Sequence, residues 1–370
     1  MNSRLYYLDS LRAILMLLGV VLHSAAPFTQ SKYWLVSYSN SSLFLDYLNA
    51  SIHSFRMPLF FMIAGFFSLM LIERMSSAQY LRNRVLRLLL PCVVVLFTFN
   101  MLQALVLTYF SQSYEGFDLE NILSHWQGHF SISHLWFLIN LFIYCCFLLP
   151  AAWLTHALFK DALARLSIYR HNKSLCLILG MLALPMLNTL VLAIGQAGLP
   201  IYETFFIVGM PYYLVYYSIF FFVGAWIFSF KDLLSIIEKQ TYLWLTALLV
   251  TSAVLYFHPF DNNNIEKVVV SYLEALRILV LCLFIWSVFS RLVVQNNVIL
   301  SKLSNASYTI YLLHHFFVVA LVVLLIESGL SLPPIPAFLL IMTVVYVLTY
   351  VIHAKVINKS AAMTRLLNGK

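Results

Sequence analysis

Ten long, almost uncharged apolar stretches constrain this chain more than any other feature of its sequence. Each is close to the roughly 20 residues that an α-helix needs to cross a lipid bilayer. They are residues 11–29, 52–72, 86–110, 135–157, 174–196, 211–229, 241–257, 268–290, 306–326 and 335–354. The bilayer core offers backbone groups no partners, so segments of this length cross it as helices. The sequence therefore predicts an all-α, polytopic membrane protein of about ten transmembrane helices.

The composition excludes several other classes of protein. Of the 370 residues, 62% are apolar and only 10% are charged, whereas a soluble domain carries about 25% charged residues. A soluble enzyme, a disordered protein, a nucleic-acid binder and a secreted disulfide scaffold are all disfavoured. The five cysteines lie inside apolar stretches without the paired spacing of a zinc or haem site, which is typical of buried thiols and predicts no metal.

The charged residues predict an orientation, because cytoplasmic loops carry an excess of Lys and Arg. With the N-terminus inside, 18 of the 22 Lys and Arg residues fall on the cytoplasmic side, two (Lys32 and Lys267) fall outside and two (Arg56 and Arg277) lie within stretches. Five acidic residues are then inside, eight outside and one, Glu274, within a stretch. We expect both termini to be cytoplasmic, and the net charge of +8 to reflect topology.

Arg12 and His23 form the clearest candidate pair, because ionisable groups at membrane depth are costly and are functional candidates by default. They are 11 residues apart, which places them on one face of a helix, separated by roughly 16 Å along its axis. An arginine at the cytoplasmic entrance can hold a phosphate or carboxylate, and a histidine deeper in can act as a base. The structural alternative is an Arg12 that snorkels to the membrane surface and a His23 whose hydrogen bonds are satisfied within the helix bundle.

Other polar residues near the stretches are weaker candidates, each with a structural alternative. Glu274 and Arg277 are i,i+3 neighbours and could simply neutralise each other. His125 and His129 could hold a metal if helical, but they lack a third ligand. The remaining candidates are His53, Arg56, His134, Trp136, Tyr311 and His314. The structural alternatives for these are interfacial anchors and hydrogen-bonded core residues.

Arg84 and Arg87 precede the third stretch, in a basic segment that also holds Arg82. Such clusters ordinarily anchor a helix at the cytoplasmic interface. A basic segment near Arg12 could equally cradle a phosphorylated cofactor that arrives from the cytosol.

The usual signatures of several enzyme classes are absent from the sequence. It contains no G-x-S-x-G, P-loop, H-E-x-x-H or G-x-G-x-x-G motif. Seryl hydrolase, NTPase, metalloprotease and dehydrogenase functions therefore lack their usual support.

The chain resembles membrane-bound acyltransferase family 3. The resemblance rests on Arg12-x10-His23, Arg84-x-x-Arg87, Ser307-Tyr308-x-x-Tyr311-Leu312-x-His314, and the stretches 7–13, 15–19, 53–57, 133–138 and 305–307. These motifs run from near the N-terminus to the ninth stretch, although residues 158–265 carry none that we can match. Within the family the chain looks most like the succinyltransferases of periplasmic glucans, which implies a single acyltransferase domain over residues 1–370.

The resemblance implies a mechanism and a set of partners. An acyl-CoA, with succinyl-CoA as the expected donor substrate and no permanently bound cofactor, would be held by Arg12, Arg84 and Arg87. His23, with Arg12, would be the catalytic group and would take a proton from a glucan hydroxyl. Arg56 or Arg277 could pair with the donor's second carboxylate. The expected partners are acyl-CoA, periplasmic glucan or another cell-surface carbohydrate, the lipid bilayer of the bacterial inner membrane and the glucan-synthesis machinery, with no nucleic acid.

Two other functions stay open from the sequence. One is acetylation of a different cell-surface polysaccharide or an O-antigen, since a fold does not fix a substrate. The other is a transporter or flippase that moves an anionic lipid or glycan along the intramembrane Arg and His residues. Paired interrupted helices in corresponding halves would favour a transporter, and the sequence shows no clear pair.

Overall fold

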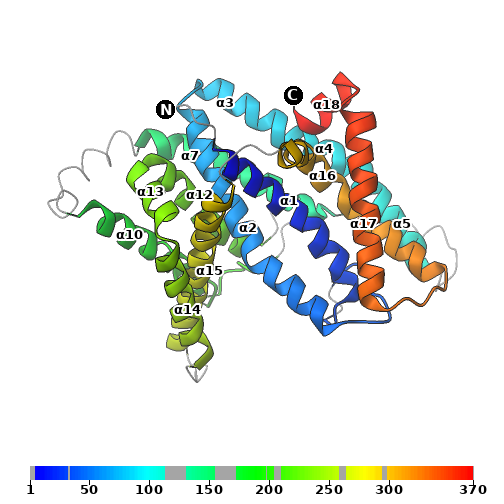
Figure 1. Ribbon diagram of the computed structural model, residues 1–370, viewed down its shortest axis with the longest axis horizontal. Coiled ribbons are helices and arrows are strands. Elements are labelled where there is room, and N and C mark those ends of the chain that lie inside the picture. Colours follow the sequence, from blue (N-terminus) through cyan, green and yellow to red (C-terminus); the bar gives the residue numbers. More distant parts are fainter. Residues whose placement is uncertain are drawn as a thin grey trace. The chain divides into compact units, whose positions relative to one another are not determined.

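The described part of the molecule is helical and contains no strand. The computed structural model describes residues 5–31, 34–112, 131–154, 172–196, 198–203, 210–257, 264–293 and 298–369. Within them, nine helices are long and apolar enough to cross a membrane, and a tenth candidate is a bent pair (Figure 1). The prediction of an all-α polytopic membrane protein with about ten spans is confirmed, whereas the orientation of the termini stays a prediction.

The long helices coincide with the ten predicted stretches. Their bounds are α1 (Tyr6–Ala25), α2 (Leu43–Ile72), α3 to α5 (Ser77–Gln112, with two π-helical segments), α7 (Trp136–Leu154), α10 (Lys173–Ala183), α11 (Met186–Gln196), α12 (Pro211–Ser229), α13 (Lys231–Lys239), α14 (Thr241–Phe257), α15 (Asn264–Leu292), α16 (Val298–Glu327), α17 (Pro334–Ile352) and α18 (Ala361–Asn368). A further π-helix, η6, covers His353–Ile357.

Two of the predicted spans are less regular than a single straight helix. The fifth is divided between α10 and α11 by a turn at Leu184 and Pro185, where a proline cannot continue the hydrogen-bond ladder. The seventh, α14, follows the short helix α13 after a bend of 74°. Strongly apolar composition predicts that such segments cross the membrane, but it does not report local breaks.

The chain folds as two compact units, each built from several segments. Unit 1 comprises Met1–Leu11, Phe55–Arg82 and Asn140–Asn296, and unit 2 comprises Arg12–Ser54, Asn83–Ile139 and Asn297–Lys370. Helices α1, α2 and α7 each contribute residues to both units.

Unit 1 contains a very close helix contact between α2 and α12. A Cβ atom added to Gly65 would lie 1.8 Å from the carbonyl oxygen of Phe221, and one added to Gly224 would lie 1.7 Å from that of Met62. Only glycine lets two helix backbones approach so closely. Phe61, Tyr144 and Tyr217 pack beside this contact with ring centroids about 5.3 Å apart. The two glycines therefore set the distance between α2 and α12.

Unit 2 is organised around α16, which packs against α17 (Figure 1). Its apolar core joins residues of α1, α5, α16 and α17, and includes Val20, Val318 and Ile341. The hydroxyl of Tyr346 on α17 donates to the carbonyl of Leu17 on α1, 2.7 Å away. These contacts hold α1 beside α16 and α17, and so fix the surroundings of His23.

The C-terminal helix α18 packs against the segment that carries Arg87. It contacts the π-helix η2 (Val85–Leu89) and α4 (Leu90–Val95). Gly369 ends α18 in the left-handed region, at φ 62°, and a Cβ there would lie 2.4 Å from the carbonyl oxygen of Leu86. Thr309 on α16 donates to Asn368, 3.1 Å away. The segment between residues 85 and 95 therefore owes part of its packing to the C-terminal region.

Candidate active site

Four histidine side chains gather inside unit 2. His23 comes from α1, His134 from the 3-10 helix η4 (Ser133–Leu135), and His314 and His315 come from α16. The ring of His23 lies 5.2 Å from that of His314 and 4.8 Å from that of His315 between centroids. His134 stacks on His315 at 4.8 Å. We refer to these four side chains as the histidine cluster.

The parallel packing of α1 and α16 brings His23 and His314 together. Two contacts show the register: Ser307 lies 3.7 Å from the sulfur of Met16, and the ring of His314 lies beside that of His23. His23 is seven residues after Met16, and His314 is seven residues after Ser307. Equal spacing on both helices means that they run side by side in the same direction for about 10 Å, or two turns.

A tight turn presents His134 to the cluster. Ser133 adopts a left-handed conformation at φ 47°, which costs a non-glycine residue roughly 1–3 kcal/mol and is found most often at functional sites. The amide of the buried Asn100 donates to the carbonyls of Ser131 and Ile132, at 3.1 and 3.2 Å, and Tyr311 donates to the carbonyl of His134. The strained turn is therefore held by side chains from α16 and from the π-helix η3 (Leu96–Asn100).

Hydrogen bonds to oxygen acceptors set the tautomers of the three buried histidines. Nδ1 of His314 lies 2.6 Å from the carbonyl oxygen of Tyr311, and Nδ1 of His315 lies 2.7 Å from Oε1 of Gln103. Nε2 of His134 lies 3.2 Å from the carbonyl oxygen of Leu312. Because these oxygens only accept, the ring nitrogen that faces each one carries the hydrogen, and in the neutral imidazole the other nitrogen keeps its lone pair.

His23 is the most accessible member of the cluster. His134, His314 and His315 are buried, with at most 6% of their surface exposed, whereas His23 is half-buried. The indole ring of Trp34 forms a wall beside it, 6.4 Å from His23 and 5.5 Å from His315. A substrate hydroxyl can therefore reach His23 more readily than any other imidazole of the cluster.

The cluster does not have the geometry of a metal centre. Among the described residues, no group of three or more His, Cys, Asp or Glu side chains converges as metal ligands would. The loop histidines His125 and His129 lie outside the described residues. What the four rings offer instead is a buried group of imidazoles next to one accessible histidine.

The other residues predicted in this part of the chain lie around the cluster or away from it. Arg12 lies on α1 with His23, as the periodicity predicts, and is half-buried. The ring of Tyr311 lies 5.4 Å from that of His134. Trp136 begins α7, two residues after His134, and is half-buried. His53 is exposed on α2 and is not a member of the cluster.

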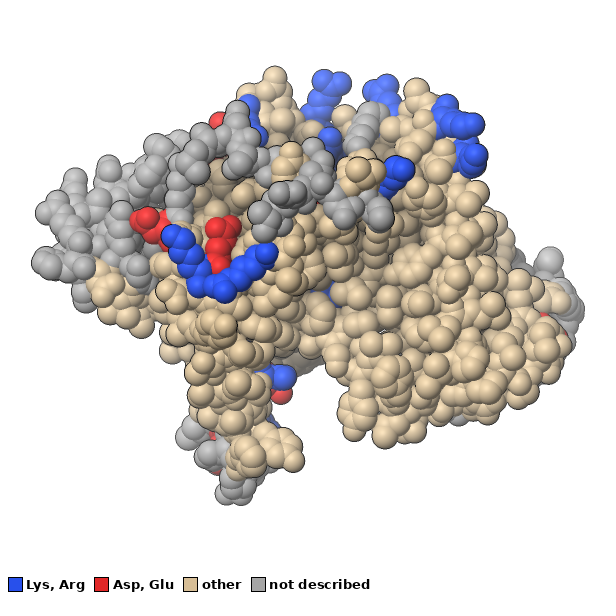
Figure 2. All heavy atoms as spheres, viewed as in Figure 1, with Lys and Arg blue, Asp and Glu red and all other residues tan. Residues whose placement is uncertain are grey.

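Arg84 and Arg87 flank the start of a π-helix rather than a regular helix. Arg84 ends α3, is half-buried and donates to Oδ1 of its neighbour Asn83 at 2.6 Å. Arg87 is exposed, and its carbonyl accepts from Tyr308 on α16 at 2.7 Å. Figure 2 shows several Lys and Arg side chains along the upper edge of the view, near α18.

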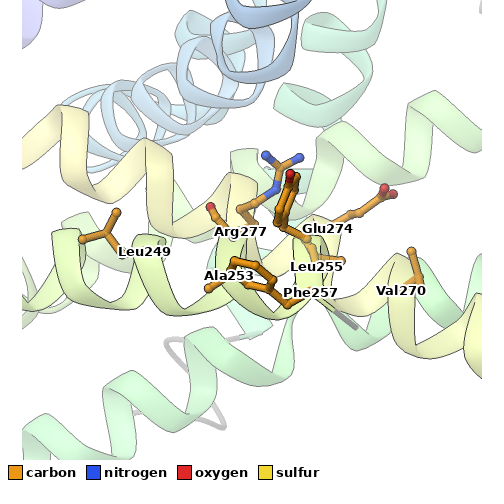
Figure 3. Close-up of a pocket in the computed structure, with 9 residues that line it drawn as sticks. Leu249, Ala253, Leu255, Phe257, Val270, Glu274 and Arg277 are labelled. Carbon is orange, nitrogen blue, oxygen red and sulfur yellow. The ribbon is translucent and has the colours of Figure 1, made fainter. Parts of the chain in front are cut away.

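The candidates of unit 1 lie on α2 and α15. Arg56 is buried, with 7% of its surface exposed, and interacts electrostatically with Tyr217. Glu274 is exposed and Arg277 half-buried. Between these two described residues no ion pair forms, and Figure 3 shows the carboxylate and the guanidinium pointing apart. Both charges are presented to a pocket, and their mutual neutralisation stays a prediction.

The sequence interpretation missed part of the cluster's support. Gln103 holds His315 from α5, and Ser133 lies 3.4 Å from the same ring. His315 itself was visible beside His314 in the sequence, but its contact with His23 was not. A buried glutamine in an apolar stretch was the one available signal for Gln103, because buried amides need partners.

Comparison with known proteins agrees with this arrangement. A family model described as an acyltransferase domain matches residues 5–354. Glucans biosynthesis protein C of Escherichia coli K12 is 39% identical over 147 residues, which covers 38% of this chain and 37% of that protein. The proteins of the same name from E. coli strains SMS-3-5 and O1:K1 are 38% identical over the same length. These alignments thus span little more than a third of the relatives.

The search of solved structures gave no significant match. The family model, in contrast, leaves out only the first four and the last sixteen residues, and it covers the whole histidine cluster and the Arg84–Arg87 segment. The chain therefore belongs to this acyltransferase family.

Proposed function

We propose that the chain transfers a succinyl group from succinyl-CoA to a hydroxyl of periplasmic glucan. The observation that carries this proposal is the half-buried His23 at the head of a buried imidazole cluster, in a chain similar to proteins named for glucan biosynthesis. The proposal places the chain in the bacterial inner membrane with both termini in the cytoplasm, so that the donor arrives from the basic side.

Donor binding in this proposal uses the arginines of unit 2. The exposed Arg87 and the half-buried Arg84 bind the phosphates of the acyl-CoA, because guanidinium groups bind phosphate oxygens in a bidentate manner. Arg12 guides the acyl arm along α1 toward His23. The roughly 16 Å between Arg12 and His23 along the helix axis is the path that a pantetheine arm has to cover.

Transfer then follows general-base catalysis. Neutral His23 takes the proton of a glucan hydroxyl while the hydroxyl oxygen attacks the thioester carbonyl carbon. The carbon–sulfur bond breaks, the acyl group is left as an ester on the sugar, and the proton passes to the departing CoA thiolate. The neighbouring imidazoles pack against His23 and hold its ring in place while the positive charge develops on it.

The test measures the product on the acceptor. Periplasmic glucans from cells with and without the protein are compared by mass spectrometry, and the proposal expects succinyl groups only where the protein is present. A His23→Ala variant that reaches the membrane in normal amounts should give unsubstituted glucan. Fully substituted glucan in that variant would refute the role of His23. A mass shift of another size in the wild type would show that a different acyl group is transferred.

One further comparison separates this enzyme from a transporter. Glucan or lipid that moves across proteoliposomes without any acyl donor would favour a transporter. Formation of acylated glucan by the purified protein in detergent, where no second compartment exists, would favour the enzyme.

A further inference from the structure

A group of tyrosines marks one end of α12 in unit 1. Tyr212 and Tyr216 stack with centroids 6.0 Å apart and an interplanar angle of 13°, and Tyr213 and Tyr217 repeat this arrangement at 6.0 Å and 20°. Tyr202, which precedes the helix, adds its ring 5.3 Å from Tyr212. Tyr202 is 51% exposed, so the group has a buried end and an accessible end.

Two pockets share residues of α15, and Tyr212 of this group lines the second of them. The first, of about 650 Å³, lies between α14 and α15 and presents Glu274 and Arg277 (Figure 3). The second, of about 420 Å³, is lined by Tyr212 and by Glu266, Lys267 and Ser271. Both pockets include Val270 and Glu274, so they form one groove, which we call the α15 groove.

The polar groups of the α15 groove fit a neutral ligand that carries many hydroxyls. Over the whole groove two carboxylates, Glu266 and Glu274, are balanced by Lys267 and Arg277, so no net charge selects an anion. Carboxylates accept hydrogen bonds from hydroxyl groups, and tyrosine offers an apolar ring face together with a polar tip. Lipid tails would not need charged residues in this position, where they are costly.

A buried hydrogen-bond network supports the floor of the groove. The amide nitrogen of Asn188, which is 4% exposed, donates to Ser271 of the groove at 2.9 Å, and Asn188 also interacts with the hydroxyl of Tyr212. The carbonyl oxygen of Asn188 has no hydrogen-bond partner among the described residues. Asn188 itself lines neither pocket, so its part is to hold Ser271 and Tyr212 in position beneath the groove.

We propose that the α15 groove binds the carbohydrate acceptor, with Tyr202 and Tyr212 against a sugar face and Glu274 accepting from sugar hydroxyls. The proposal rests on the proposed function, because it names the site of that reaction's acceptor. It is compatible with the predicted topology, in which residues 197–210 and 258–267 lie on the outer side, where a periplasmic glucan would arrive.

The experiment measures glucan binding separately from transfer. Unsubstituted glucan, purified from cells that lack the protein, is titrated against the purified full chain without an acyl donor. Tyr202→Ala and Glu274→Gln should each weaken binding and raise the KM for glucan by about tenfold, the effect of one lost hydrogen bond or ring contact, with kcat for acyl transfer retained. Tyr202→Phe should bind normally, because it keeps the ring.

A matched control and the contrary outcomes make the test decisive. Tyr242→Ala removes a tyrosine that is 78% exposed on α14 but outside the groove, and it should leave glucan binding unchanged. Unaltered glucan binding in both Tyr202→Ala and Glu274→Gln would overturn the proposal. Binding of phosphatidylglycerol, and not of glucan, in the groove would overturn it as well. If the wild-type protein binds glucan through the groove but forms no ester, the proposed function fails while the acceptor site stands.

Discussion

The ring of His23 stands nearly perpendicular to the ring of His315, with 4.8 Å between their centroids and 75° between their planes. One histidine is half-buried and the other is 3% exposed. The edge of one imidazole thus faces the face of the other, an arrangement that aromatic rings favour. His315 in turn is fixed by Gln103, so the orientation of the accessible histidine depends on a residue of α5.

Replacing Gln103 should reduce transfer without preventing folding. Gln103→Leu removes the acceptor that keeps hydrogen on Nδ1 of His315, and we expect kcat to fall by roughly 10- to 100-fold, the usual range for losing a second-sphere partner of an imidazole. Gln103→Glu keeps an acceptor and should retain most activity. The matched control is Gln30→Leu at an exposed position, and equal kcat in Gln30→Leu and Gln103→Leu would contradict the role.

The two arginines before α4 should govern the affinity for the donor. The double substitution Arg84→Ala with Arg87→Ala should raise the Kd for acyl-CoA by at least about tenfold, because each guanidinium–phosphate contact is a charge-assisted hydrogen bond. Isothermal titration with the purified chain measures the change. Lys355→Ala with Lys359→Ala removes two exposed charges from the same unit and should have a smaller effect. Equal losses of acyl-CoA affinity in the two double variants would mean that Arg84 and Arg87 contribute only general positive charge.

The rate should depend on pH through a neutral histidine. If His23 is the general base, its neutral form is the active one, so kcat/KM rises with pH as the imidazole loses its proton and then levels off. Initial rates of ester formation between pH 5 and pH 8 test this expectation. The acidic limb should be absent from the residual activity of His23→Ala, and a profile that is unchanged in that variant would assign the titration to another group.

Adding one methyl group between α2 and α12 should destabilise unit 1. Gly65→Ala or Gly224→Ala would place a Cβ less than 2 Å from a backbone carbonyl oxygen, and neither helix can yield without moving its neighbours. We expect a loss of roughly 1–3 kcal/mol, as for other overpacked positions, which shows as a lower midpoint in thermal unfolding in detergent. Ala64→Ser, at the adjacent half-buried position, should leave the midpoint nearly unchanged.

The fold was largely predictable because the membrane limits the choices. Length and apolar composition identify each span, since only a continuous helix satisfies the backbone in lipid, and the 3.6-residue period placed Arg12 and His23 on one face. The turn at Pro185 and the bend before α14 are local events that average hydropathy does not detect.

The site was less predictable, for two physical reasons. Gln103 and His315 are 212 residues apart, and no local pattern shows that their helices meet. Glu274 and Arg277 have the spacing of an ion pair, but their side chains diverge (Figure 3), because spacing restricts where two residues lie and not which way flexible chains turn. The tyrosine pairs of α12 have i,i+4 spacing in the sequence, yet this spacing is equally typical of a core stripe.

The docking of α18 also has a consequence for how the protein is made. Residues 361–369 pack against residues 85–95, yet the ribosome synthesises about 270 intervening residues before the contact can form. The segment with Arg87 therefore lacks its packing partner α18 while the rest of the chain is translated and inserted. A chain that stalls late in translation would carry the complete histidine cluster and still lack a finished Arg84–Arg87 segment.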